Sequence, residues 1–94
     1  MRKVFWNKLA QADYFQIIDY LLINWGESSA QDFIDKVENI ELILTAGKID
    51  FEKTNRKNIR RCVVAKQITL FYKTCQNHSV ELLRFWNNYQ DIKN

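Results

Sequence analysis

Positively charged and aromatic residues are interleaved in the last third of the sequence, and this combination can bind anions. Two adjacent arginines begin the segment RRCVVA, and a third lies within VELLRFW. Guanidinium groups hold phosphates or carboxylates through charge-assisted hydrogen bonds, and aromatic rings offer surfaces on which bases stack. The candidate binding residues are therefore Arg60, Arg61, Arg84, Trp86 and Tyr89.

Each of these residues also has a purely structural interpretation. Arg60 and Arg61 are neighbours in a predicted strand, so their side chains leave on opposite faces of the sheet. One can then face a ligand while the other is a solvated charge at the rim. Arg84 either presents its guanidinium on an open sheet face or pairs with an acid such as Glu81, because an unpaired charge in an apolar strand is costly. The two aromatic residues suit packing at the rim as well as stacking.

The signatures of common enzyme classes are absent from the sequence. It has no glycine-rich phosphate loop, no GxSxG, no HExxH and no paired cysteine motif. Cys62 and Cys75, with the single histidine His78, cannot complete the usual tetrahedral zinc site. We therefore expect no cofactor, no structural metal and no disulfide framework.

Charge is strongly segregated along the chain. Its 94 residues, 47% apolar and 27% charged, suit one domain covering 1–94. Residues 7–46 contain seven acids and two bases, residues 47–73 contain eight bases and two acids, and the whole chain carries only +3. The basic segment is typical of a surface that faces a polyanion, although a partner or dimer interface can use it equally well.

Two amphipathic helices are predicted in the first half of the chain. Apolar residues recur with helical spacing within 8–24 and 29–46. The two glycines, Gly26 and Gly47, follow these patterns, where a left-handed backbone ends a helix at low cost. The short link between the patterns predicts an antiparallel helical hairpin.

An antiparallel sheet is predicted in the second half. Runs of β-branched and aromatic residues lie near 58–65, 68–74 and 79–86, with hairpin-sized connections between them. A short strand at residues 3–6, KVFW, can join the same sheet. The predicted fold class is therefore α+β: a strand, an antiparallel helical hairpin, and a three-stranded antiparallel meander.

The pairing of the first two meander strands is predicted from their connection. If Ala65 lies opposite Ile68, then Val63 pairs with Leu70. Both faces of the resulting sheet are partly apolar, so the sequence leaves open which face the helices cover.

This order of elements, together with several phrases of the sequence, resembles the RelE/ParE family of type II toxins. The similarity runs from about Val4 to Asp91 and is carried by VFWNKLAQADYFQIIDYLLINWGESSAQDFIDKVE, NIRRCVV, ITLFYKT and ELLRFWNNYQD. The resemblance implies a small bacterial toxin of a toxin–antitoxin system, associated with growth inhibition and plasmid stabilization and neutralised by a cognate antitoxin.

The resemblance allows two targets, because RelE-like members cut messenger RNA on the ribosome whereas ParE-like members poison DNA gyrase. RelE-like nucleases carry four basic residues at defined positions of the sheet and just after it. Arg60 matches one of these positions, whereas Cys62, Thr69 and Asn88 stand at the other three. Tyr89 lies near the terminal acid/base of those nucleases, so it is a catalytic candidate only if the chain is a nuclease.

ParE-like sequences match better at two arginines. Arg60 and Arg84 correspond to arginines that are common in that branch. The resemblance therefore implies a ParE-like toxin that inhibits DNA gyrase, with target-binding residues Arg60, Arg61, Arg84, Trp86 and Tyr89. A RelE-like ribosome-dependent mRNA endonuclease is the alternative, and a non-toxic interaction module of the same fold is a second one.

The expected partner is the antitoxin. Phe15, Tyr20 and Ile23 lie off the main apolar stripe of the first helix and need cover. We expect an antitoxin segment that folds on binding to cover them, while its acids approach residues 47–73. A homodimer and a heterotetramer with the antitoxin both remain open. We expect a cytoplasmic protein without membrane contact.

Overall fold

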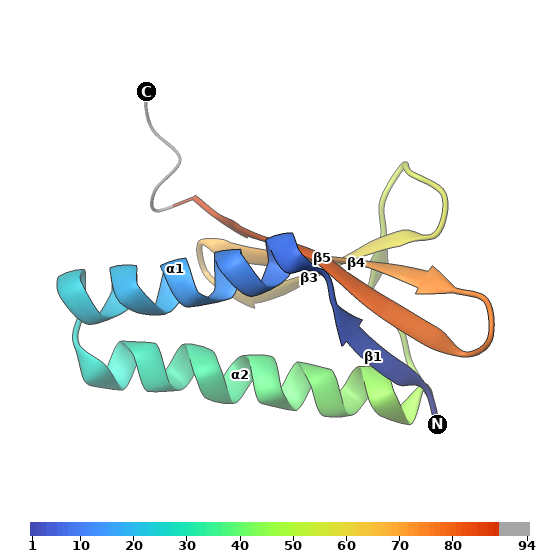
Figure 1. Cartoon of the computed structure of the whole chain (residues 1–94), viewed down its shortest axis with the longest axis horizontal. Coiled ribbons are helices and arrows are strands. Elements are labelled where there is room, and N and C mark those ends of the chain that lie inside the picture. Colours follow the sequence, from blue (N-terminus) through green and yellow to red (C-terminus); the bar gives the residue numbers. More distant parts are fainter. Residues whose placement is uncertain (89–94) are drawn as a thin grey trace.

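The chain forms a two-layer α+β domain, with two helices packed on one face of a sheet (Figure 1). It is described from a computed structural model that places residues 1–88. Its elements in chain order are β1 (Lys3–Trp6), α1 (Lys8–Asn24), α2 (Glu27–Ala46), β2 (Glu52–Lys53), β3 (Ile59–Ala65), β4 (Ile68–Cys75) and β5 (Ser79–Asn87). The predicted fold class is confirmed.

The sheet has five strands in the order β1-β5-β4-β3-β2. Strands β3, β4 and β5 form the expected antiparallel meander, and β1 lies parallel to β5 at one edge. Strand β2, at the other edge, was not predicted, since a strand of two residues within a polar segment carries no periodic signal. Figure 1 shows α1 and α2 side by side and antiparallel.

The helical hairpin closes more tightly than the sequence predicts. Gly26 has φ of 102°, a conformation that is costly for other residues, and it serves as the N-cap of α2. The chain therefore reverses within Trp25 and Gly26, and α2 begins at Glu27 instead of residue 29. Gly47 ends α2 in the left-handed conformation, as predicted.

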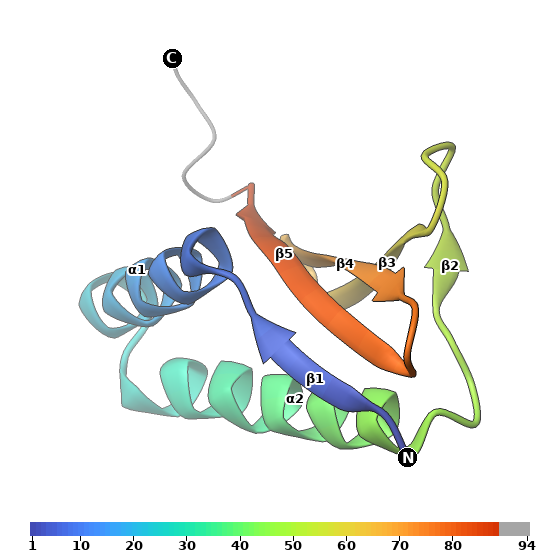
Figure 2. The same ribbon diagram turned by 45° about the vertical axis from the view of Figure 1, so that its right-hand side comes forward.

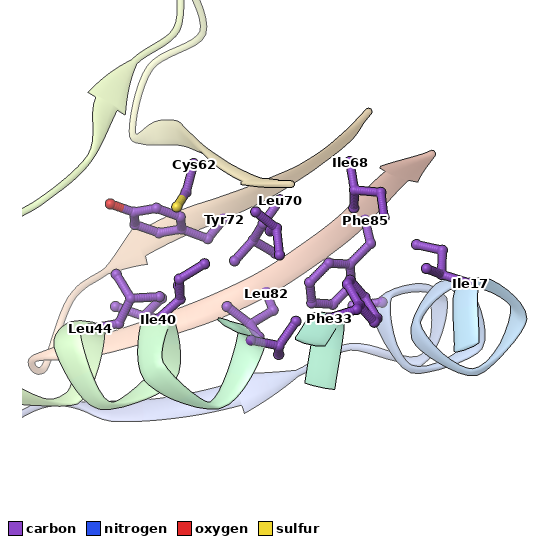
Figure 3. Packing of buried hydrophobic residues seen from close by; sticks show 14 of the residues in the cluster. Ile17, Phe33, Ile40, Leu44, Cys62, Ile68, Leu70, Tyr72, Leu82 and Phe85 are labelled. Carbon is purple, nitrogen blue, oxygen red and sulfur yellow. The ribbon is translucent and has the colours of Figure 1, made fainter. Parts of the chain in front are cut away.

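The core lies between the helices and the sheet and shows which sheet face the helices cover (Figure 3). Tyr72, Leu70 and Leu82 point from β4 and β5 toward the helices and are almost fully buried. From the helices, the core receives Ala10, Ile17, Leu21, Ala30, Phe33, Val37, Ile40 and Leu44. Among residues 1–88, no helix is long and apolar enough to cross a membrane.

A β-bulge makes the predicted register of β3 and β4 wrong. Ala65 does oppose Ile68, but an extra residue at Val64 makes Val63 oppose Thr69 instead of Leu70. Two successive residues on the bulged strand then face a single position on the partner. The shift gives β3 and β4 a common buried face, which the predicted register would have divided between core and solvent.

Candidate functional site

Arg60 and Arg61 point to opposite faces of β3, as their adjacency predicts. Arg60 lies on the helix-facing side at the edge of the core, where its Nη1 donates to the carbonyl oxygen of Phe51 at 2.8 Å. Arg61 lies on the open face and pairs with Glu52 of β2, with its Nε and Nη2 at 3.2 and 3.0 Å from the two carboxylate oxygens. This pair raises the pKa of Arg61 and lowers the pKa of Glu52.

A concave basic surface surrounds Arg60, and we call it the basic pocket. It is built from the end of β2, the loop that follows, the start of β3 and one residue of β4. Its lining residues are Lys53, Thr54, Asn55, Arg56, Lys57, Asn58, Ile59, Arg60 and Thr74. Three of its four bases, Lys53 of β2 with Arg56 and Lys57 of the loop, were not among the predicted site residues. The dense run of bases in residues 47–73 was the signal for them.

Hydrogen bonds within the loop hold the basic pocket in shape. The hydroxyl of Thr54 donates to the carbonyl oxygen of Ile59 at 2.8 Å and accepts from the backbone N–H of Arg56 at 3.1 Å. Asn58 takes a positive φ of 65°, and its carbonyl oxygen accepts from the backbone N–H of Thr74 at 2.9 Å. The loop is therefore tied both to itself and to β4.

Neither acid of the same segment lines the basic pocket. Asp50 pairs with Arg2 at 2.8 Å, and Glu52 pairs with Arg61 on the other face of the sheet. Within residues 1–88, none of the four bases of the pocket forms an ion pair with an acid. Among these residues, their positive charge is therefore not neutralised by an ion pair.

Arg84 is paired within the protein, and its partner is Asp13 of α1 instead of Glu81. The Nε and Nη2 of Arg84 donate to the two oxygens of Asp13 at 2.7 and 3.0 Å, and the backbone N–H of Phe85 donates to the same carboxylate at 2.9 Å. The Asp13 side chain is 11% exposed and that of Arg84 44%. These contacts join β5 to α1 and raise the pKa of Arg84. Its direct role in target binding stays a prediction.

Trp86 lies beside this pair. It is 44% exposed, and its indole N–H donates to the side-chain oxygen of Asn88 at 2.7 Å. With Asp13, Arg84 and Gln16 it lines a shallow groove between α1 and β5. Trp86 is therefore available to a partner at the rim of the sheet. Tyr89, the remaining candidate, lies outside the described residues.

The positions expected for a nuclease do not converge on one catalytic site. Arg60 and Cys62 face the helices, whereas Thr69 lies on the open face beside β3 and β5. Cys62 is 5% exposed, and its burial raises the pKa of the thiol to about 11. A thiol that is neutral at physiological pH and enclosed by the core neither transfers protons to a ligand nor stabilises a phosphate.

The same burial predicts a difference in reactivity between the two thiols. In the folded protein a disulfide reagent such as DTNB should modify the half-buried Cys75 and leave Cys62 unmodified, because only an accessible thiolate reacts. Unfolding in guanidinium should release the second thiol. The control is Cys75→Ser, and rapid labelling of that folded variant at pH 8 would contradict the buried position of Cys62.

The three residues predicted to bind an antitoxin differ in exposure. Phe15 and Ile23 on α1 are 62% and 82% exposed, whereas Tyr20 is half-buried and packs against the core. Phe15 also lines an apolar depression with Phe5 and the side chains of Val4, Trp6, Gln11 and Tyr14. One end of α1 thus presents an aromatic surface to solvent.

Comparison with known proteins gives the family. The family model described as "ParE toxin of type II toxin-antitoxin system, parDE" matches residues 4–92. A comparison with curated protein sequences finds no match.

The fold is shared with solved structures of toxins. The chromosomal ParDE toxin–antitoxin system from P. aeruginosa is similar with a TM-score of 0.69 and 17% identity, covering 93% of this chain and 96% of that one. The E. coli DinJ-YafQ toxin–antitoxin complex is similar with a TM-score of 0.63 and 11% identity, covering 98% of each chain. The structures agree with the family match, and the chain belongs to the ParE toxin family of type II toxin–antitoxin systems.

Proposed function

We propose that this toxin inhibits DNA gyrase by binding to it, without acting as a nuclease, and that a cognate antitoxin neutralises it. The proposal rests on the residues that stand where RelE-like nucleases carry basic groups. Cys62 is buried with a raised pKa, and Thr69 lies on the other face of the sheet, so neither can assist proton transfer at a phosphate beside Arg60. The chain also belongs to the ParE family, and the resemblance of its sequence to ParE-like toxins implies gyrase as the target.

Target binding is proposed to rest on charge-assisted hydrogen bonds from Arg60. Its guanidinium is held by the carbonyl of Phe51, which fixes the direction of the remaining N–H groups. Arg61, Arg84 and Trp86 are proposed to contribute from the open face and the rim. Arg61 and Arg84 already have an acidic partner, so Arg60 is the arginine whose guanidinium is most available to a target.

Expression in bacteria with separate measurements of DNA damage and messenger RNA cleavage tests this function. Induction of the toxin should raise a DNA-damage reporter, leave ribosome-bound transcripts intact and be harmless when the neighbouring antitoxin gene is expressed. Tyr89→Phe removes only a hydroxyl and should keep full toxicity. Codon-aligned cleavage of transcripts that disappears in Tyr89→Phe would contradict the proposal and favour the endonuclease.

The antitoxin is proposed to cover the exposed apolar residues of α1 with a segment that folds on binding. Phe15 and Ile23 have no cover in the described residues, and the aromatic depression beside Phe15 offers a place for an apolar side chain. The acids of the same segment would approach the bases of residues 47–73. Tyr20, which is already half-buried, contributes less new buried area.

Replacing both Phe15 and Ile23 by glutamate should weaken antitoxin binding by about 100-fold or more. Burial of each large apolar side chain contributes roughly 1.5–3 kcal/mol, and both contributions are lost. Both residues are exposed, so the fold should survive. The control is Leu42→Glu, which places a glutamate at the 65% exposed position of Leu42 on α2. Titration calorimetry with the antitoxin measures the effect, and equal affinity of both variants would contradict this docking surface.

A further inference from the structure

We propose that the basic pocket of the β2–β3 loop binds the phosphodiester backbone of a nucleic acid. This activity goes beyond gyrase inhibition, because it gives the toxin a direct contact with nucleic acid that needs no other protein. The proposal rests on four bases that line one concave surface: Lys53, Arg56, Lys57 and Arg60. None of them has an acidic partner within residues 1–88.

The positive charge of this surface is not neutralised by the acids of the same segment. Two acids lie within the same segment, yet Asp50 is held by Arg2 and by the hydroxyl of Tyr72, and Glu52 by Arg61. Neither acid lines the pocket, and the four bases repel one another unless an anion lies between them. A concave site with charge of one sign concentrates its field and attracts a polyanion.

The shape of the loop is formed before any ligand binds. The hydroxyl of Thr54 bridges Arg56 and Ile59, and the carbonyl of Asn58 is bonded to Thr74 of β4. Arg60 is fixed by its bond to the Phe51 carbonyl. Binding therefore orders fewer backbone groups than it would in a flexible loop, which favours affinity.

The chemistry of the lining suits phosphate oxygens. Arginine and lysine donate to them with charge assistance, and the exposed amides of Asn55 and Asn58 and the hydroxyl of Thr74 are further groups of the kind that contact the backbone of nucleic acids. Among the residues that the structure describes, no aromatic side chain lines the pocket. We therefore infer recognition of the backbone without reading of the base sequence.

The position of the pocket suits a long polymer. Figure 2 shows β2 and the loop after it standing clear of both helices. The bases run from Lys53 before the loop, through Arg56 and Lys57 within it, to Arg60 on β3. Successive phosphates of one strand can thus meet different bases of the pocket, whereas a single small anion would use only part of them.

Fluorescence anisotropy with the full-length toxin and a labelled 20-base-pair DNA duplex tests the proposal, with single-stranded RNA of the same sequence as a second probe. Four phosphate contacts predict that raising the salt from about 50 to 200 mM weakens binding by about 100-fold, because each contact releases counterions. Stronger binding of one probe identifies DNA or RNA as the source of the backbone. Neither gyrase nor the ribosome is present, so the result is separate from the test of toxicity.

The decisive variant is Arg56→Gln with Lys57→Gln, two exposed positions in the loop. It should lower the slope of log affinity against log salt concentration by the amount that about two phosphate contacts contribute. It should also weaken binding in low salt by about 10-fold or more. The matched control is Lys8→Gln with Lys36→Gln, which removes the same charge from exposed positions on the two helices and should bind like the wild type.

Three results would overturn the proposal. The first is no binding of either probe at about 50 mM salt. The second is an equal loss of binding in the two double variants, since this would trace the effect to net charge alone. The third is a salt dependence that stays unchanged in Arg56→Gln with Lys57→Gln, since these two bases would then make no phosphate contact. Thermal unfolding of each variant excludes loss of the fold as the cause.

Discussion

Replacing Asp13 by alanine is expected to lower the free energy of unfolding by about 2 kcal/mol. The carboxylate accepts two hydrogen bonds from Arg84 and one from the backbone N–H of Phe85, and its side chain is only 11% exposed. Its loss leaves a partly buried N–H without an acceptor and a guanidinium without a partner. In a domain of this size the midpoint of thermal unfolding should fall by roughly 8–16 °C.

A matched control and a double-mutant cycle make this prediction specific. Asp19→Ala removes an exposed acid from the same helix and should change stability by no more than about 0.5 kcal/mol. Arg84→Ala should destabilise less than Asp13→Ala, because Arg84 is more exposed and the Phe85 bond survives. If the effects of Asp13→Ala and Arg84→Ala add in the double variant, the two side chains do not interact, and the structural role assigned to Arg84 is wrong.

The ion pair between Arg84 and Asp13 changes how the toxicity of Arg84 variants should be interpreted. A loss of toxicity in Arg84→Ala can come from a lost target contact or from loosening of β5 against α1. Asp13→Asn separates these causes, because it weakens the pair while leaving Arg84 in place. Direct target contact by Arg84 predicts that Asp13→Asn stays toxic, whereas a positioning role predicts that both variants lose toxicity together.

Replacing Arg60 by alanine is expected to weaken target binding by about 10- to 100-fold. A charge-assisted hydrogen bond contributes roughly 1.5–3 kcal/mol, which corresponds to this range of affinity. Arg61→Ala should have a smaller effect, since its guanidinium is already engaged by Glu52 on the opposite face. Affinity for purified gyrase, measured by titration of each variant, provides the comparison.

The contrast between the two adjacent arginines identifies the face that meets the target. A larger loss in Arg61→Ala than in Arg60→Ala would move the binding surface from the edge near Phe51 to the open face of the sheet. Arg60→Lys keeps the charge but not the fork of donors, so it should recover only part of the affinity. Unfolding curves must confirm that the loss of the Arg60 bond to Phe51 leaves the fold intact.

Most of the fold was predictable because its signals are local. The apolar stripes of α1 and α2 and the positive φ at Gly26 and Gly47 define the helical hairpin, and β-branched runs define the meander. The register was not predictable, because the bulge at Val64 adds one residue whose side chain resembles its neighbours. That single residue decides which side chains of β3 reach the core.

Only part of the candidate site was predictable, because some of its contacts join residues that are far apart in the sequence. The opposite orientation of Arg60 and Arg61 follows from strand geometry, and this prediction is confirmed. The partner of Arg84 is 71 residues away in sequence, on α1, and no local pattern indicates Asp13 as that partner. The basic pocket likewise depends on the path of a loop, which composition reveals as charge but not as shape.

The proposed inhibition of DNA gyrase by this ParE family toxin can be measured in a supercoiling assay with purified components. Toxin added to gyrase, relaxed plasmid and ATP should inhibit supercoiling and accumulate cleaved plasmid, and addition of the antitoxin should restore activity. Unchanged supercoiling at a toxin concentration that cuts messenger RNA on purified ribosomes would rule out gyrase as the target and favour the endonuclease.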